Sequence, residues 1–186
     1  MKAGVRALGV AESYREATST LAGTVVRASR IVDGFVFGSC TVGGSDATAA
    51  IVEMAERLDR EDVRYLLVSG IAPAWFNLVD LPRLHAATGL PVCAVSYEAS
   101  SGLESAIREG FDDPDAVDDR LATYRAQPDR RPVTVADGTV YVRSVGIDDD
   151  EAADVVRAFT PEGGRPEPLR VAQLAASAVD SFRRDR

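Results

Sequence analysis

Two largely apolar runs, at residues 63–68 and 92–97, constrain the fold of this chain more than any other feature of its sequence. Each has the length of a β-strand and is bounded by charged residues or glycine, which is typical of a strand buried on both faces of a sheet. A short helical segment through Leu84 separates the two runs and closes at Gly89, and a further helix is expected at residues 102–111. Repeated strand–helix units of this kind predict an α/β fold with helices on both faces of the sheet.

Three β-rich segments come before these units and are separated from one another by short polar stretches or turns. They occupy residues 5–10, 21–28 and 31–38. Their spacing predicts an antiparallel meander. Three antiparallel strands followed by two strand–helix units is the element order of the ribonuclease H-like fold, so we expect a mixed sheet of that kind.

The remaining elements are read from turn and cap signals. Ser45 or Asp46 can cap a helix that ends near Leu58, because apolar residues recur between them at helical spacing. The dipeptide Asp137-Gly138 predicts a late hairpin. The acidic run at residues 148–151 favours the start of a helix through its dipole, and we interpret these acids as capping groups and not as metal ligands. A final amphipathic helix is expected at residues 169–182.

Length and composition set the expected organisation of the protein. A chain of 186 residues with 46% hydrophobic residues is the size of one ordinary domain, so we expect one domain over residues 1–186, with the hairpin and C-terminal helices added from about residue 130. The first residues run directly into a strand pattern without a signal sequence, and every apolar run is far shorter than the roughly 20 residues of a membrane helix. A cytoplasmic protein without membrane contact is therefore expected.

The charge balance is unusual, because Lys2 is the only lysine and the formal net charge is −8. This composition suggests adaptation to high salt, a hypothesis that loss of the fold at low salt would support. An acidic surface ordinarily argues against a nucleic-acid partner. At molar salt, however, the Debye length is only about 3 Å, so single arginines must be judged individually. The two cysteines, Cys40 and Cys93, lie in apolar runs and are expected to be buried thiols, and one histidine, His85, cannot complete a zinc site or a serine hydrolase triad.

Five segments resemble one archaeal family related to endonuclease V, sometimes called endonuclease dU, over nearly the whole chain from Lys2 to about Ala176. The segments are residues 6–10 (RALGV), 41–48 (TVGGSDAT), 69–72 (SGIA), 76–80 (FNLVD) and 166–172 (PEPLRVA). The resemblance implies a ribonuclease H-like fold and a metal-dependent DNA repair endonuclease that cuts near deaminated bases such as deoxyuridine or deoxyinosine. It also implies carboxylates that hold Mg²⁺ or Mn²⁺ and orient a water for attack on the phosphate.

The sequence departs from the family pattern at two of the expected metal ligands. Ala11 stands where an aspartate is expected after Gly9-Val10, with Glu12 next, and Ser69 stands where the fourth strand should end in Asp-Gly. Because side chains alternate along a strand, Glu12 should point away from the side that Ala11 faces, unless the strand ends or bulges there.

Three acids remain candidates for catalysis, namely Glu12, Asp46 and Asp80, with Glu12 and Asp46 as the candidate metal ligands. Asp46 lies in the segment that resembles the family just before the first helix. Two roles are open for it: it contributes to a metal or phosphate site, or it serves only as the helix cap. Asp80 could approach the same end of the sheet or could simply cap a short helix.

Other candidate substrate-binding residues lie in loops around the same end of the sheet. Trp75 and Phe76 follow a central strand, where they either stack on a base or plug the core under the loop. Gly43 and Gly44 precede a helix and either offer N–H groups to a phosphate or form an ordinary tight turn. Arg170 is expected in the first turn of the last helix, where a cation needs a carboxylate or phosphate partner.

These features support three functional hypotheses. The first is an endonuclease V-like, metal-dependent DNA repair nuclease or a diverged descendant of one. The second, which Ala11 and Ser69 favour, is a catalytically silent module of the same fold that binds nucleic acid or nucleotides. The third is an assembly subunit whose hairpin around Asp137-Gly138 pairs with a partner strand.

Overall fold

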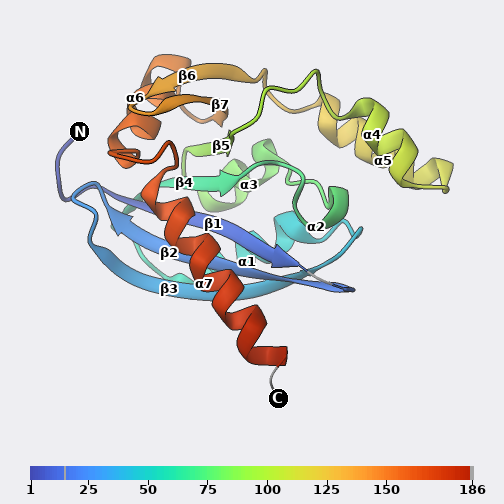
Figure 1. Ribbon diagram of the computed structural model, residues 1–186, viewed down its shortest axis with the longest axis horizontal. Coiled ribbons are helices and arrows are strands. Elements are labelled where there is room, and N and C mark those ends of the chain that lie inside the picture. The colour runs from blue at the N-terminus through green and yellow to red at the C-terminus, as the bar shows by residue number, and fades with distance from the viewer. Residues whose placement is uncertain (15, 185–186) are drawn as a thin grey trace.

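A seven-stranded mixed sheet forms the centre of the molecule in the computed structural model, which describes residues 1–14 and 16–184 (Figure 1). The strands are β1 Arg6–Tyr14, β2 Thr18–Arg27, β3 Val32–Thr41, β4 Val63–Ser69, β5 Val92–Ser96, β6 Arg131–Val135 and β7 Gly138–Val145. Their order across the sheet is β3-β2-β1-β4-β5-β7-β6. Neighbours β1, β4 and β5 are parallel, and all other neighbouring pairs are antiparallel. The fold is α/β and ribonuclease H-like, which confirms the prediction.

The two apolar runs form β4 and β5, which lie side by side near the middle of the sheet. Side chains alternate across these strands, so Leu66 and Val68 enter one core while Leu67, Cys93 and Val95 enter the other. Because both faces of these strands are buried, both segments are largely apolar in the sequence.

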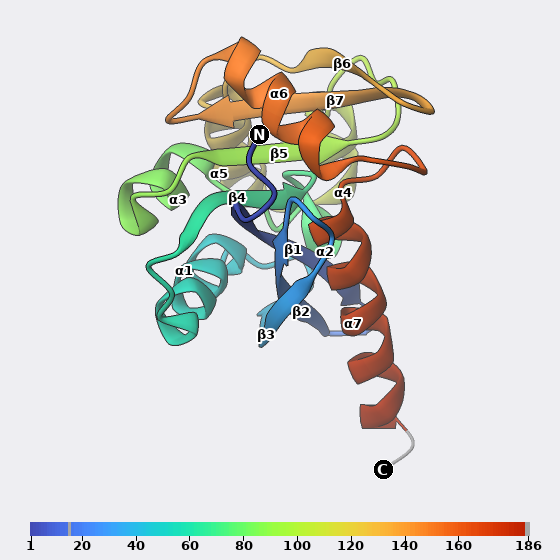
Figure 2. The same cartoon turned by 90° about the vertical axis from the view of Figure 1, so that its left-hand side faces the viewer.

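Helices cover both faces of the sheet and also lie beyond the carboxyl ends of its central strands (Figures 1 and 2). They are α1 Ala47–Leu58, α2 Pro73–Phe76, α3 Leu81–Thr88, α4 Glu104–Gly110, α5 Pro114–Arg125, α6 Asp149–Phe159 and α7 Glu167–Arg184. The first core packs under α1 and α3, and the second packs under α6 and the start of α7. None of the helices in the described part of the chain combines the length and the apolar character that crossing a lipid bilayer requires.

The long helix α7 crosses β1 and β2 (Figure 1), and a close backbone approach sets its starting point. A Cβ atom on Gly9 would lie 2.4 Å from the carbonyl carbon of Pro168, so no other residue fits there without moving the helix. The proline-containing segment at residues 166–172 and the glycine in β1 therefore act together to dock α7 on the sheet.

The strand β1 is longer than the sequence predicts, because it continues past Val10 to Tyr14 in regular register with β2. Glu12 pairs with Leu21 and Ser13 with Thr20, without a bulge. Two polar residues in a row favour the end of a strand. Here the buried hydroxyl of Ser19 on β2 donates to the Glu12 carboxylate, which keeps the polar pair satisfied and lets the ladder continue.

Both cysteines are buried thiols, as the sequence predicts. Burial raises the pKa of Cys40 and that of Cys93 to about 12, so both thiols are protonated near neutral pH. We expect neither residue to react with a maleimide in the folded protein and both to react after denaturation, as measured by the mass of the labelled chain. Labelling of either cysteine in the folded protein at neutral pH would contradict the buried, protonated state.

Candidate functional site

A cavity of about 570 Å³ opens at the C-terminal ends of β4 and β5. Its lining includes Ser69 and Gly70 at the end of β4, Ser96 and Tyr97 at the end of β5, and Glu12 of β1. Open α/β sheets carry their ligand sites outside the carboxyl ends of parallel strands, which is where this cavity lies.

Three arginines line the cavity, and each lies over the ring of a tyrosine. The pairs are Arg130 with Tyr141 at 4.2 Å, Arg143 with Tyr124 at 5.4 Å and Arg165 with Tyr97 at 4.3 Å, measured from guanidinium carbon to ring centre. Contact with a tyrosine face restrains each long side chain without neutralising its charge.

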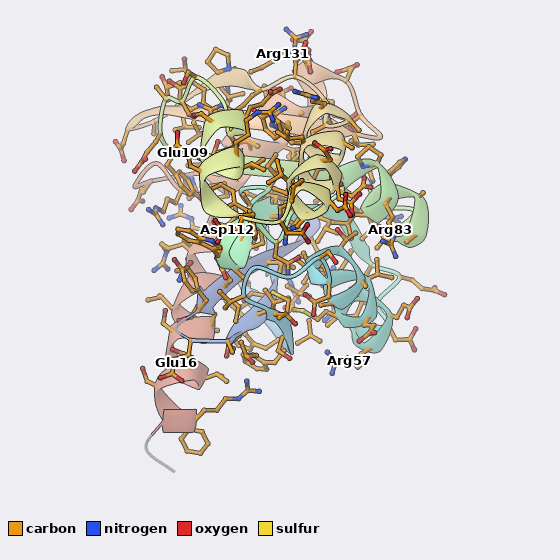
Figure 3. The ribbon with its side chains drawn as sticks, turned by 90° about the vertical axis from the view of Figure 1, so that its right-hand side faces the viewer. Glu16, Arg57, Arg83, Glu109, Asp112 and Arg131 are labelled. Carbon is orange, nitrogen blue, oxygen red and sulfur yellow. The ribbon has the colours of Figure 1, made fainter. Side chains whose placement is uncertain are left out.

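No carboxylate within the described residues forms an ion pair with any of these arginines. Two of them donate to backbone carbonyls instead, Arg130 to that of Glu98 at 2.7 Å and Arg143 to that of Pro128. By contrast Arg131, at the outer edge of the sheet in Figure 3, forms an ion pair with Asp149. Glu12 and Glu98 also line the cavity, so three arginines against two carboxylates leave its charged lining net positive in a chain of net charge −8, which suits an anionic ligand.

Hydroxyl groups complete the lining of the cavity. Burial raises the pKa of Tyr97, while the Arg165 charge and a hydrogen bond with Ser69 act in the opposite direction. The net direction is upward, so Tyr97 stays protonated near neutral pH and its hydroxyl can donate as well as accept. Ser69, which stands where the family pattern has an aspartate, therefore contributes a neutral hydrogen-bonding group beside the arginines.

Glu12 points away from the face that Ala11 occupies, as the alternation of the strand predicts. Its carboxylate accepts hydrogen bonds from the Ala74 backbone N–H at 2.8 Å and from the Ser19 hydroxyl at 2.5 Å. Each oxygen therefore already has one donor. Glu12 also lines the cavity, so its carboxylate connects β2, the segment after β4 and the cavity wall.

Asp46 precedes α1, yet its side chain does not cap the helix. The carboxylate turns back to accept from the Thr41 N–H at 3.0 Å, the Thr41 hydroxyl at 2.9 Å and the Asn77 amide at 2.6 Å. Partial burial acts to raise the pKa of Asp46, but these hydrogen bonds outweigh it and lower that pKa below its ordinary value. The capping interpretation is wrong in this respect, because Asn77 and not Asp46 accepts from the Ala47 N–H.

Asp80 caps α3, where its carboxylate accepts from the Arg83 N–H at 3.0 Å, in agreement with the capping alternative. It lines a second, smaller cavity of about 400 Å³ together with Gly43 and Gly44. Glu12 lines the first cavity and Asp80 the second, so the fold does not bring the three candidate acids to one point.

The residues present do not fit the metal site that the resemblance implies. Across residues 1–14 and 16–184, no three or more Asp, Glu, His or Cys side chains are placed to bind one ion. The Asp46 carboxylate accepts hydrogen bonds from Thr41 and Asn77, and the Glu12 carboxylate accepts hydrogen bonds from Ala74 and Ser19. Each Asp46 oxygen accepts two hydrogen bonds, so a divalent ion there would have to displace a donor, whereas Glu12 keeps acceptor sites but has no set of further ligands around it among the described residues.

The aromatic pair after β4 divides into one partly buried and one exposed ring. Phe76 packs edge-on against Phe111, with ring centres 6.2 Å apart, and therefore plugs the small core under α4 and α5. Trp75 is 50% exposed. The plug interpretation is thus confirmed for Phe76 and wrong for Trp75.

The remaining predicted site residues have structural partners. Arg170 forms a bidentate ion pair with Glu167, at 2.8 and 2.7 Å, in the first turn of α7. Gly43 and Gly44 accept from Arg120 through their carbonyls, at 2.5 and 3.0 Å, and Gly43 has a φ of 69° that favours glycine. These contacts explain the positions of Arg170, Gly43 and Gly44, so no bound ligand is needed to explain them.

The arginines of the cavity were not among the predicted site residues. Arg130 and Arg165 lie in loops that the sequence marks only as irregular, and Arg143 lies in the hairpin strand. One signal was available for Arg143, because a charged residue within an otherwise apolar strand next to a buried strand requires an explanation.

Comparison with known proteins gives one consistent family. Residues 3–180 match the family described as endonuclease dU. A UPF0215 protein of Thermococcus kodakarensis is 38% identical over 86% of this chain and 80% of its own length. A crystal structure of a protein of unknown function from Archaeoglobus fulgidus superposes with a TM-score of 0.83 at 28% identity, covering 94% of this chain and 98% of that one. Endonuclease V of Ciona intestinalis, solved with inosine-containing DNA, has a TM-score of 0.62 at 11% identity, covering 96% and 86%, and is thus similar in fold.

Proposed function

Because this chain belongs to the endonuclease dU family of archaeal proteins with an endonuclease V-like fold, we propose that it binds DNA carrying deaminated bases such as deoxyuridine or deoxyinosine. In this proposal the phosphates of the DNA occupy the cavity at the ends of β4 and β5. The protein would act in DNA repair in the cytoplasm, as one endonuclease V-like domain.

One observation carries the proposal, namely that Arg130, Arg143 and Arg165 converge on one cavity without carboxylate partners among the described residues. Guanidinium groups bind phosphate oxygens with two parallel hydrogen bonds, and they supply most of the affinity of proteins for nucleic acids. The hydroxyls of Ser69 and Tyr97 can add neutral contacts to a phosphate or a base edge.

The second candidate is endonucleolytic cleavage near the deaminated base, which family membership and the Glu12 carboxylate on the cavity wall favour. In endonuclease V-like catalysis a divalent ion would supply the charge that orients water and stabilises the phosphate. The acids of this chain do not fit such an ion, since Glu12 belongs to no group of three or more potential ligands among the described residues, the Asp46 oxygens accept from Thr41 and Asn77, and Asp80 lies in the other cavity. Binding without cleavage is therefore the function that the geometry supports best.

A single experiment separates the two candidates. Labelled DNA with one deoxyuridine or deoxyinosine, and the same DNA without the lesion, is mixed with the protein across a KCl series, with Mg²⁺, Mn²⁺ or EDTA. We expect lesion-selective binding that persists in EDTA, with intact DNA recovered. Metal-dependent strand cleavage, abolished in Glu12→Ala but retained in Asp80→Ala, would instead establish the nuclease. Equal binding to both DNAs would remove the deaminated base from the proposal.

A further inference from the structure

Trp75 is the only tryptophan of the chain, and half of its surface is exposed in the loop that follows β4. A tryptophan usually buries most of its surface when it serves the core alone. The core role here belongs to Phe76, which packs against Phe111. Packing in the core therefore does not explain the exposed half of the Trp75 side chain.

The backbone that presents this ring is held in an unusual conformation. Ala74, Trp75 and Phe76 have φ angles of 47°, 57° and 55°, so three consecutive residues that are not glycine lie in the left-handed region. Each such residue is disfavoured by contacts of its Cβ atom. Strain of this kind persists only where the surrounding structure enforces it, and it is concentrated at ligand sites.

Three hydrogen bonds enforce the conformation. The Ala74 N–H donates to the Glu12 carboxylate at 2.8 Å, the Ala74 carbonyl accepts from the Gly43 N–H at 2.7 Å, and the Phe76 carbonyl accepts from Arg120 at 3.1 Å. Glu12 itself is anchored by the buried hydroxyl of Ser19. The loop is therefore fixed at both ends of the strained segment, by a carboxylate and by a guanidinium.

The ring is supported by Phe76 and lies two residues beyond Pro73, which lines the arginine-lined cavity, while Gly43, which the ring approaches, lines the second cavity. Phe76 meets Trp75 edge-on, with ring centres 5.6 Å apart and an interplanar angle of 73°. Glu12, which accepts the hydrogen bond from the Ala74 N–H, and Pro73, which precedes Ala74, both line the cavity. Figure 3 shows this side of the molecule, with Glu109 on α4 and Asp112 between α4 and α5.

We propose that Trp75 stacks on an unpaired base of the DNA whose phosphates occupy the arginine-lined cavity, and that Glu12 is the positioning residue that holds the ring in place. This inference rests on the proposed function and names its substrate class, which is DNA with an unstacked base, either single-stranded or extruded from a duplex. Aromatic faces accept any base by stacking, while an edge-on ring below fixes the stacking plane.

The test uses Trp75 as its own reporter. A single-stranded oligonucleotide with one deoxyuridine, and the corresponding duplex, are titrated while tryptophan emission and the anisotropy of labelled DNA are recorded. We expect binding to quench the emission and to protect Trp75 from acrylamide. Trp75→Ala should bind about tenfold more weakly, as expected for one lost base stack. Phe35→Ala, which removes an equally exposed ring on the edge strand β3, serves as the matched control and should bind as the wild type does.

Glu12 is tested by a conservative pair of variants. Glu12→Gln keeps an oxygen that can accept from Ala74, so it should retain most of the emission change, whereas Glu12→Ala should lose it together with affinity. Thermal unfolding of each variant is measured first. If Glu12→Ala does not fold, DNA binding by Trp75→Ala alone tests whether Trp75 stacks on a base. DNA binding that is equally strong in Trp75→Ala would overturn this inference alone. Absence of any binding by the wild type would overturn the proposed function and this inference with it. Quenching by the duplex as well as by the single strand would identify an extruded base.

Discussion

A variant with Arg130, Arg143 and Arg165 all replaced by glutamine will bind DNA at least about a hundredfold more weakly than the wild type at the same salt concentration. Each arginine that contacts a phosphate releases a counterion on binding. The plot of log affinity against log salt concentration should therefore become less steep by about one unit per arginine removed. Glutamine preserves much of the side chain, so its packing against the tyrosines is largely kept. Titration of labelled DNA across a KCl series measures both quantities.

The matched control replaces three arginines that form ion pairs on the surface outside the cavity, and it removes the same total charge. These are Arg30, Arg125 and Arg157, which pair with Glu162, Glu104 and Asp154. We expect the control to keep most of the affinity of the wild type. An equal loss in both triple variants would mean that overall charge, and not the cavity, attracts the DNA.

The fold could be predicted from the sequence because its determinants are local. The apolar runs that become β4 and β5, the Asp137-Gly138 turn and the left-handed Gly89 that ends α3 each act within a few residues. The acidic run before α6 behaves as predicted, since the Asp148 carboxylate accepts from the Glu151 N–H at 2.8 Å.

The cavity could not be predicted in the same way, because its residues meet only after β7 pairs with β5. Arg143 lies opposite Ala94 in that pairing, and Arg130 and Arg165 arrive from loops on either side of the hairpin and α6. A sequence pattern for one element contains no information about this convergence. Ser69 and Ala11 depart from the ligand pattern that the resemblance implies, and this departure was visible in the sequence without any knowledge of the cavity.

The cap of α1 shows how a long-range contact can replace a local one. Ser45 and Asp46 have the residue types of an N-cap, but Asn77, 31 residues further along the chain than Asp46, accepts from the Ala47 N–H at 2.9 Å. The same amide donates to the Thr41 carbonyl at 2.8 Å and to Asp46 at 2.6 Å. One fully buried side chain thus connects the end of β3, the start of α1 and the loop that carries Trp75.

Asn77→Ala will therefore destabilise the fold by about 3 kcal/mol, since it leaves the buried Ala47 N–H and the Thr41 carbonyl without their partner and removes one donor from the Asp46 carboxylate. For a chain of this size that loss lowers the midpoint of thermal unfolding by roughly 6–12 °C. Asp80→Ala, which removes only an ordinary helix cap, should cost about 1 kcal/mol. Calorimetry of both variants at equal salt measures the difference. Similar midpoints for the two would show that the Asn77 network does not contribute beyond a local cap.

The pH dependence of stability gives an independent reading of the same network. The pKa of Asp46 is below its ordinary value of 3.8 in the folded protein, because the donors Thr41 and Asn77 favour the charged form. Its contribution to stability is therefore complete above that ordinary value and is lost as the pH falls through the lower, folded pKa. Asn77→Ala removes one of the donors, so the folded pKa of Asp46 moves back toward 3.8 and the acid-dependent part of its stabilisation shrinks. The midpoints of the variant and the wild type should consequently lie closer together at low pH than at neutral pH. A constant difference between them at every pH would place the effect of Asn77 in packing and not in its hydrogen bond to the carboxylate.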